Sequence, residues 1–227
     1  MISFTINKIF DWQIFWYILY FIYINQTSVV IKETNELKIA EQVMEVHPDS
    51  ALRILQKLRP EKYSSDANRA LYGLLLFEAL DKNHMSLQPD SLINFSIDYY
   101  LKKEDKLHLA MAYFYKGRKL KYKTEYEKAA IEYYKSIDNC NPNYHKLLLG
   151  KIYEDLAVIS YIQSEYKEAR KKNQLAASFY LKAGRPEFAY NTLTSIGITY
   201  LAENKHSTAR SYFKKVYSLS KDRKSVV

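Results

Sequence analysis

The sequence has 227 residues, of which 48% are hydrophobic and 26% charged, but it contains only five glycines and five prolines. Sandwiches and barrels need turn residues about every 8–12 positions, and nucleotide-binding α/β folds need glycine-rich loops, so the composition excludes both classes. The formal net charge of +9 suits nucleic acid, an anionic membrane surface or an acidic protein as a partner.

The first predicted element is an apolar segment within residues 1–30. From Trp12 to Ile24 only Gln13 is polar, and Lys8 precedes this stretch. Its length suits the apolar part of an export signal. A membrane-spanning helix of about 20 residues would have to include the polar residues 25–28 as well. Because no small-x-small cleavage motif follows, we expect an uncleaved anchor that contacts a membrane through residues 9–28, with the bulk of the protein in the periplasm.

Three other interpretations of this segment stay open. It could be a poorly cleaved signal peptide, a helix packed on the first repeat, or the product of a start codon placed too far upstream. If the segment is not an export signal, we expect a cytoplasmic protein.

Residues 31–220 predict helices separated by short breaks. All five prolines lie at these breaks, and no alternating pattern typical of strands competes. The predicted helix pairs are 34–46 with 49–58, 65–81 with 89–101, 104–121 with 124–138, 145–162 with 164–182, and 186–202 with 204–220. Short connections make successive helices antiparallel neighbours. We therefore expect an all-α fold, followed by a basic tail at residues 221–227.

An internal repeat appears when the chain is aligned with itself at an offset of 40 residues. Small residues form two columns: Gly117, Ala157 and Gly197, then Ala129, Ala169 and Ala209. Two other columns are mostly aromatic: Tyr126, Tyr166 and His206, then Tyr133, Asn173 and Phe213, in which Asn173 is the exception. Antiparallel helices cross closely where small residues face each other, so we expect the six small residues to have a structural role at the crossings.

These columns resemble the tetratricopeptide repeat (TPR), with a Tyr-Glu-Lys-Ala-like run at Tyr126–Ala129 and Tyr166–Ala169. The resemblance covers about residues 36–220 and implies an α-solenoid of about five helix pairs. The period of 40 exceeds the usual 34, which leaves armadillo- and HEAT-like repeats open. More narrowly, Pro48–Leu52 and Ala79–Asn83 are similar to segments of envelope-associated TPR proteins of Gram-negative bacteria.

The TPR resemblance implies that a groove, lined by the first helix of each pair, binds a segment of a partner protein. The family's groove positions are here Met111, Phe114, Arg118 and Lys121, then Lys151, Glu154, Val158 and Tyr161, then Asn191, Thr194, Ile198 and Leu201. This set is apolar with a basic end, which suits an acidic or amphipathic peptide or helix. The alternative is that Phe114, Val158, Ile198 and Leu201 pack against neighbouring repeats or merely face solvent. We expect a non-enzymatic interaction scaffold, tethered to a membrane.

A second hypothesis is a nucleic-acid-binding or regulatory protein that uses a basic patch at residues 102–123. The patch comprises Lys102, Lys103, Lys106, Lys116, Arg118, Lys119, Lys121 and Lys123. We rank this hypothesis second, because the sequence contains no aromatic–basic RNA motif and no paired-helix DNA reader.

Nothing in the sequence supports an enzyme. The five histidines lie at least 24 residues apart, Cys140 is the only cysteine, and no nucleophile-elbow motif is present. We therefore predict no catalytic residues, no metal site, no cofactor and no small-molecule substrate. The last three residues, 225–227, match the S-x-V pattern that carboxylate-binding domains recognise, a match too short to weigh heavily.

Overall fold

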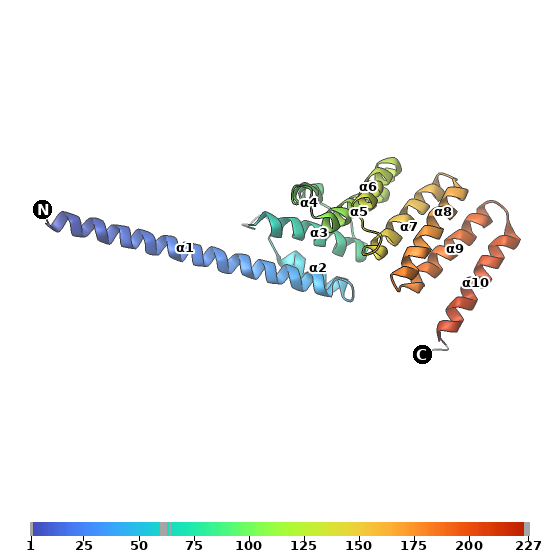
Figure 1. Cartoon of the computed structure of the whole chain (residues 1–227), viewed down its shortest axis with the longest axis horizontal. Helices are drawn as coiled ribbons and strands as arrows, with labels where there is room; N and C mark the ends of the chain where they lie inside the picture. The colour runs from blue at the N-terminus through green and yellow to red at the C-terminus, as the bar shows by residue number, and fades with distance from the viewer. Residues whose placement is uncertain (1, 60–62, 64, 225–227) are drawn as a thin grey trace. The chain divides into compact units, whose positions relative to one another are not determined.

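The structure is a computed structural model that describes residues 2–59, 63 and 65–224, with the side chains of residues 15–25, 27, 34–59, 63 and 65–221. Throughout this described part, the regular elements are helices (Figure 1). The prediction of an all-α helical-repeat solenoid is confirmed. The chain divides into two compact units, Met1–Tyr99 and Tyr100–Val227, called here the N-terminal unit and the C-terminal unit.

The N-terminal unit begins with one long helix, α1 (Ile2–Val43), followed by α2 (Pro48–Lys57) and α3 (Asp66–Lys82). Helix α4 (Asp90–Lys102) crosses the boundary between the units. We predicted a separate helix at residues 34–46, whereas α1 continues through residue 30 without a break (Figure 1). The end of α1 packs against α2 and α3, with Leu37 and Ala40 buried on one helical face and Met44 buried just after the helix.

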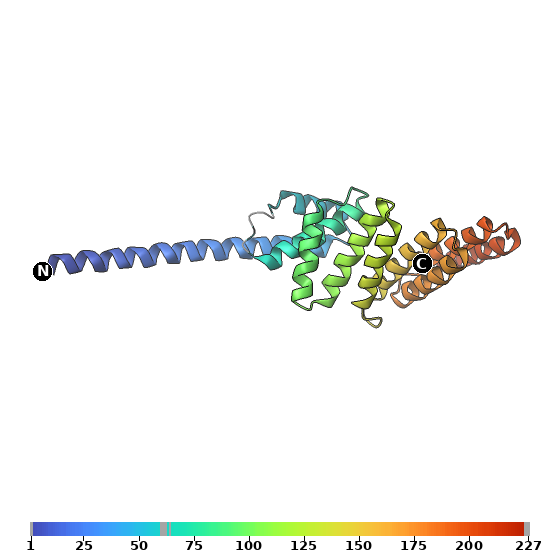
Figure 2. The same cartoon turned by 90° about the horizontal axis from the view of Figure 1, so that it is seen from above.

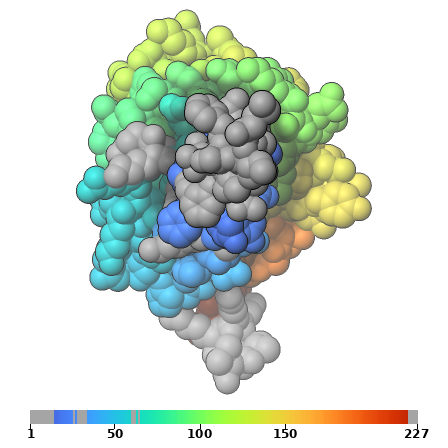
Figure 3. All heavy atoms as spheres, turned by 90° about the vertical axis from the view of Figure 1, so that its left-hand side faces the viewer, coloured from blue at the N-terminus to red at the C-terminus, as the bar shows by residue number. Residues whose placement is uncertain are grey.

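The middle of α1 has a different character. Each of the ten successive side chains from Phe15 to Ile24 is a large hydrophobic group, and each is at least 40% exposed. Ten residues make almost three helical turns, so these groups lie on every side of the helix. Figure 3 shows some of them in blue, open to the solvent.

Membrane spans require a long and strongly apolar helix. Among the residues that the structure describes, no helix meets both requirements.

The C-terminal unit consists of three helical hairpins, seen in green to red in Figure 2. Their helices are α5 (Lys106–Tyr122) and α6 (Tyr126–Asp138), α7 (Lys146–Ile162) and α8 (Tyr166–Lys182), and α9 (Pro186–Ala202) and α10 (His206–Lys224). Each helix contacts the next one along the chain. The predicted helices agree closely with these bounds, except that α10 continues to Lys224 and thus includes residues 221–224 of the predicted tail.

The same turn closes successive hairpins at intervals of 40 residues. In each turn an N–H group bonds to the carbonyl oxygen five residues earlier, a Schellman geometry that satisfies the end of the first helix. These bonds join Met85 to Leu80, Glu125 to Leu120, Glu165 to Ser160, and Lys205 to Tyr200, at 2.8–3.0 Å. The preceding residues have a positive φ of 55–63°: His84, Thr124, Ser164 and Asn204. The repeat in the sequence is therefore also a repeat of the backbone.

The small residues pack at the helix crossings, though against unexpected partners. All six predicted structural residues are buried. A Cβ atom on Gly117 would lie 2.7 Å from Tyr133 Cδ1, and one on Gly197 would lie 2.5 Å from Phe213 Cε1. The nearest neighbour of each glycine is thus an aromatic ring of the second helix, rather than the alanine that we predicted. Each glycine makes room for a ring.

Two serines show that the repeat extends into the N-terminal unit. Ser136 Oγ donates to the carbonyl oxygen of Ala110 at 2.6 Å. Forty residues earlier, Ser96 Oγ donates to the carbonyl oxygen of Ala70 at 2.7 Å. Both hydrogen bonds join the two helices of a hairpin, so α3 and α4 follow the same packing plan as α5 and α6.

Candidate partner-binding groove

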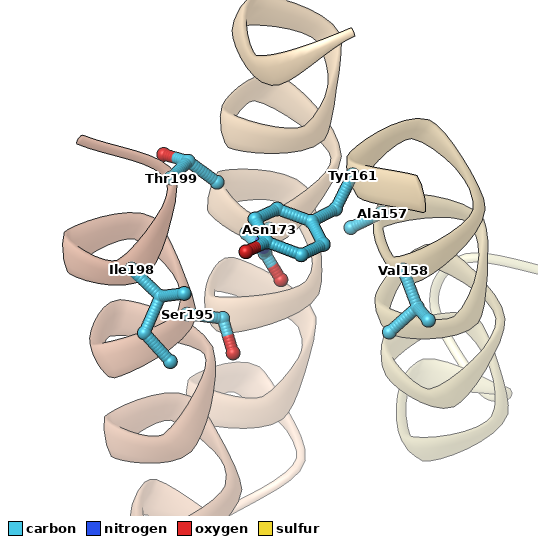
Figure 4. Close-up of a pocket in the computed structure, with 7 residues that line it drawn as sticks. All are labelled: Ala157, Val158, Tyr161, Asn173, Ser195, Ile198 and Thr199. Carbon is cyan, nitrogen blue, oxygen red and sulfur yellow. The ribbon is translucent and has the colours of Figure 1, made fainter. Parts of the chain in front are cut away.

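Three of the predicted groove residues meet around one pocket in the C-terminal unit. Val158 and Tyr161 extend from α7 and Ile198 from α9, while α8 forms the floor (Figure 4). The pocket has a volume of about 150 Å³ and is also lined by Ala157, Asn173, Ser195 and Thr199. Val158, Tyr161, Ile198 and Leu201 are each 38–42% exposed, so the apolar groove positions of these two repeats face solvent. The alternative that neighbouring repeats bury them does not hold here.

The polar groups of the pocket differ in their hydrogen bonding. Ser195 Oγ donates to the carbonyl oxygen of Asn191 at 3.2 Å, and Thr199 Oγ1 donates to that of Ile196 at 2.6 Å. The side chain of Asn173 is only 4% exposed, and it makes no hydrogen bond to any residue that the structure describes. The Tyr161 ring lies across the pocket in front of Asn173 (Figure 4).

The groove positions of α5 lie in a different environment. Phe114 is 1% exposed, and its ring packs against the rings of Tyr115 and Tyr133, with centroids 5.1 and 6.0 Å away. We predicted Phe114 to contact a partner, and that assignment is wrong because the ring belongs to the core between α5 and α6. Met111 is half-buried.

Arg118 and Lys121, the predicted basic end of the groove, converge on Asp155 of α7. Asp155 is 6% exposed, forms an ion pair with Lys121, and lies 3.6 Å from Arg118 Nε. It also accepts a hydrogen bond of 2.9 Å from the Tyr133 hydroxyl. Burial first, and then the charge of Asp155, raise the pKa of Tyr133 well above its usual range. Asp155 therefore compensates one of these two positive charges within the unit.

Glu154 is a further part of this polar cluster. It accepts a hydrogen bond of 2.5 Å from the Tyr180 hydroxyl of α8. Burial is the main reason why the pKa of Glu154 lies above its usual value, and the same cause raises the pKa of Tyr180. The other predicted groove residues lie nearer to solvent: Lys151 and Thr194 are half-buried, and Asn191 is exposed.

Solved structures of other proteins share this arrangement of helices. The chain is similar to a crystal structure of MamA protein, with a TM-score of 0.55 and 20% identity over 85% of this chain and 94% of that one. It is also similar to the nearly identical TPR-like repeats of a kinesin light chain from Podosopora anserina, with a TM-score of 0.59 and 13% identity over 85% and 96%. A MamA chain from Desulfovibrio magneticus RS-1 gives a TM-score of 0.54 and 18% identity over 84% and 96%.

The chain has the TPR fold. The resemblance to TPR proteins is thus confirmed at the level of the fold, while the association with a Gram-negative envelope stays a prediction. No family model and no curated protein matches the sequence.

In the structure, the cationic side chains of the predicted basic patch lie in different environments. Lys119 is 6% exposed, and burial, followed by the charge of Lys123, lowers its pKa. Lys116 lies 3.8 Å from Glu132, and Arg118 and Lys121 face Asp155. The remaining four, Lys102, Lys103, Lys106 and Lys123, are exposed. Helical periodicity therefore separates cations that are adjacent in the sequence, which gives nucleic-acid binding less support.

Within the described residues, no group of three or more histidine, cysteine, aspartate or glutamate side chains could hold a metal ion. Cys140 is half-buried, and burial raises the pKa of its thiol to about 12. The thiol is therefore protonated at neutral pH and a poor nucleophile. The S-x-V match at residues 225–227 lies outside the described residues.

Sequence reasoning missed two residues that organise this region. Asp155 joins α5, α6 and α7, but its column in the repeat contains Tyr115 and Ser195, so no periodic signal marks it. Asn173 was visible as the polar exception in an aromatic column. Its position on the pocket floor became evident only from the structure.

Proposed function

We propose that this protein is a non-enzymatic scaffold that binds a segment of a partner protein in the groove between α7 and α9. The observation that carries this proposal is the exposure of Val158, Tyr161 and Ile198 around a single pocket. Isolated exposed apolar side chains are ordinary on protein surfaces, whereas contiguous ones around a hollow favour an interface. The TPR fold supports the same conclusion, because stacked helical repeats present extended binding surfaces.

The partner segment is acidic. The C-terminal unit has 25 lysines and arginines against 13 aspartates and glutamates, a net charge of +12, whereas the N-terminal unit has 9 against 12, a net charge of −3. The positive field of the C-terminal unit attracts an acidic segment and accelerates its association. We expect binding to weaken as salt is added, because salt screens exposed charges.

The test is site-specific photo-crosslinking of the full chain in cells. A photoreactive phenylalanine analogue is placed at Val158 or Ile198 in the groove, and at the exposed Gln174 of α8 as the matched control. We expect the two groove positions to crosslink to one short segment of one protein, and the Gln174 position not to do so. A synthetic peptide of that segment should then bind the purified chain and compete with the crosslinking.

Two outcomes of this experiment would contradict the proposal. Equal crosslinking from Gln174 and from the groove would show that the groove is not the binding surface. Crosslinks to nucleic acid, with an affinity that falls steeply with salt concentration, would instead support the basic patch as the functional site.

We also propose that residues 9–28 tether the scaffold to a membrane, with the bulk of the protein in the periplasm. The support is the run of exposed apolar side chains from Phe15 to Ile24, which includes Trp16 and five other aromatic residues suited to a membrane interface. Placing this surface in water is unfavourable, and a lipid environment removes that cost.

Fractionation of the full chain in a Gram-negative host tests the tether. We expect membrane-bound protein that protease digests in intact spheroplasts, and an amino-terminal mass that retains residues 1–24. Soluble protein that resists the added protease would contradict both the tether and the periplasmic location.

A further inference from the structure

We propose that the pocket between α7, α8 and α9 binds one aromatic side chain of the acidic partner segment, with tyrosine preferred over phenylalanine. This inference rests on the proposed scaffold function and names the anchor that the groove recognises. It is carried by two independent observations, the shape of the pocket and the chemistry of its floor.

The shape follows from the pairing of residues at the three helix crossings. Gly117 packs against the ring of Tyr133 in the first hairpin, and Gly197 packs against the ring of Phe213 in the third. In the second hairpin the same two columns contain Ala157 and Asn173, and both line the pocket. The flanking hairpins therefore fill this position with their own aromatic ring. The middle hairpin has a short side chain there and a cavity beside it.

The cavity is large enough for the missing ring. A protein cavity of about 150 Å³ holds a benzene molecule, and this pocket has that volume. Its walls include Ala157, Val158 and Ile198, which provide apolar contacts for a ring. Tyr161 lies across the pocket and offers an aromatic face for edge-to-face or offset packing.

The chemistry of the floor selects a phenol. Asn173 is 4% exposed and lines the pocket, and no hydrogen bond joins its carboxamide to a described residue. An apolar ring that excludes solvent from the pocket leaves this amide without a hydrogen-bond partner, whereas a hydroxyl on the ring can replace the solvent. The first hairpin shows such an arrangement within the chain, because the ring of Tyr133 is buried while its hydroxyl donates to Asp155. Phenylalanine fills the same volume without this hydrogen bond.

The first test uses p-cresol, the side-chain analogue of tyrosine, as the probe. Titration of the full chain with p-cresol, followed by NMR, should shift the side-chain amide signals of Asn173 and the backbone signals of Ser195 and Thr199. The double variant Ala157→Gly with Asn173→Tyr reproduces the pairing of the first hairpin and places a ring in the pocket. We expect it to abolish these shifts, whereas Gln174→Tyr, an exposed change on the same helix, should leave them unchanged.

The second test separates the shape of the pocket from its polarity. Wild-type protein should bind p-cresol several-fold more tightly than toluene, in line with one recovered hydrogen bond. Asn173→Leu conserves most of the side-chain volume and removes the carboxamide, so it should abolish this preference while toluene still binds. An unchanged preference in Asn173→Leu would overturn the assignment of the phenol to Asn173. Circular dichroism establishes that each variant is folded, and the Asn173→Leu result stands even where the double variant fails to fold.

The last test distinguishes failure of this inference from failure of the scaffold proposal. Acidic peptides with one central Tyr, Phe or Ala are compared as competitors of p-cresol, together with a single-stranded oligonucleotide. We expect the order Tyr, Phe, Ala, and no competition by the oligonucleotide. Competition by the oligonucleotide alone, or equal binding of p-cresol to wild type and the double variant, would overturn the aromatic anchor. Crosslinking to a protein segment from Val158 and Ile198 in spite of that result would leave the scaffold proposal intact.

Discussion

At the scale of single residues, the turns between helices contain conformational strain. Thr124 and Ser164 have a positive φ between the two helices of their hairpins, a conformation that L residues other than asparagine and aspartate rarely adopt. Gly184 occupies a similar conformation, with φ of 70°, between α8 and α9. The β-branched Thr124 is the least suited of these residues to its position.

We predict that Thr124→Gly stabilises the protein by about 0.5–1 kcal/mol, because relief of the strain outweighs the greater freedom of glycine in the unfolded chain. The converse change, Gly184→Ala, should destabilise it by about 1 kcal/mol, since nothing lies within 4 Å of the added Cβ and only the backbone conformation is affected. The urea unfolding midpoint measures both effects. A lower midpoint for Thr124→Gly would show that the turn is not strained.

A second prediction concerns the buried alanines of the repeat. Ala169 is 0% exposed at the start of α8. Ala169→Leu should destabilise the fold by about 1–3 kcal/mol, because the larger side chain forces the helices apart. Leucine at the exposed position Lys171 is the control and should have little effect. If both variants unfold at the wild-type midpoint, Ala169 does not lie at a close helix crossing as the repeat alignment predicts.

At the scale of elements, a polar cluster joins the hairpins. Tyr180 of α8 donates to Glu154 of α7, and Tyr133 of α6 donates to Asp155 of α7. Both acceptors are carboxylates on α7, so this helix is held on both of its sides by buried tyrosine hydroxyls. Such hydrogen bonds fix the register of helices that apolar packing alone leaves free to slide.

This cluster makes stability depend on pH through Glu154. Burial, together with the charge of Asp155, raises its pKa above the usual 4.5, although the Tyr180 hydrogen bond, Arg118 and Lys121 lower it. The folded state therefore favours the protonated carboxyl. This contribution is complete below pH 4.5, and it is lost as the pH rises through the elevated pKa of the folded state.

Glu154→Gln removes the titration and keeps a hydrogen-bond acceptor for Tyr180. We predict that wild type loses stability relative to Glu154→Gln between pH 4 and pH 7, measured as the difference between their urea midpoints. The other carboxyl groups titrate in both proteins, so their contributions to the pH dependence cancel in this difference. A constant difference over this range would mean that Glu154 is not perturbed by burial.

At the scale of the whole molecule, α1 has two parts that differ in burial. Its end supplies Leu37 and Ala40 to the core of the N-terminal unit, whereas Phe15–Ile24 are exposed. We predict that deletion of residues 1–24 leaves the unfolding midpoint nearly unchanged and abolishes membrane association. Leu37→Ala should instead lower the free energy of unfolding by about 2–4 kcal/mol, because it leaves a cavity in the core. It should leave membrane association intact. A large loss of stability on deletion would show that the apolar segment packs on the repeats.

The sequence by itself determined the helices, their hairpin pairing and the 40-residue repeat, because these depend on local periodicity, prolines and small residues spaced along one chain. Tertiary structure decided that Phe114 belongs to the core, that Arg118 and Lys121 converge on Asp155, and that Asn173 forms the floor of a pocket. Each of these depends on which side chains of different helices meet, and that is set by the rotation and crossing of the packed helices, which no local pattern specifies.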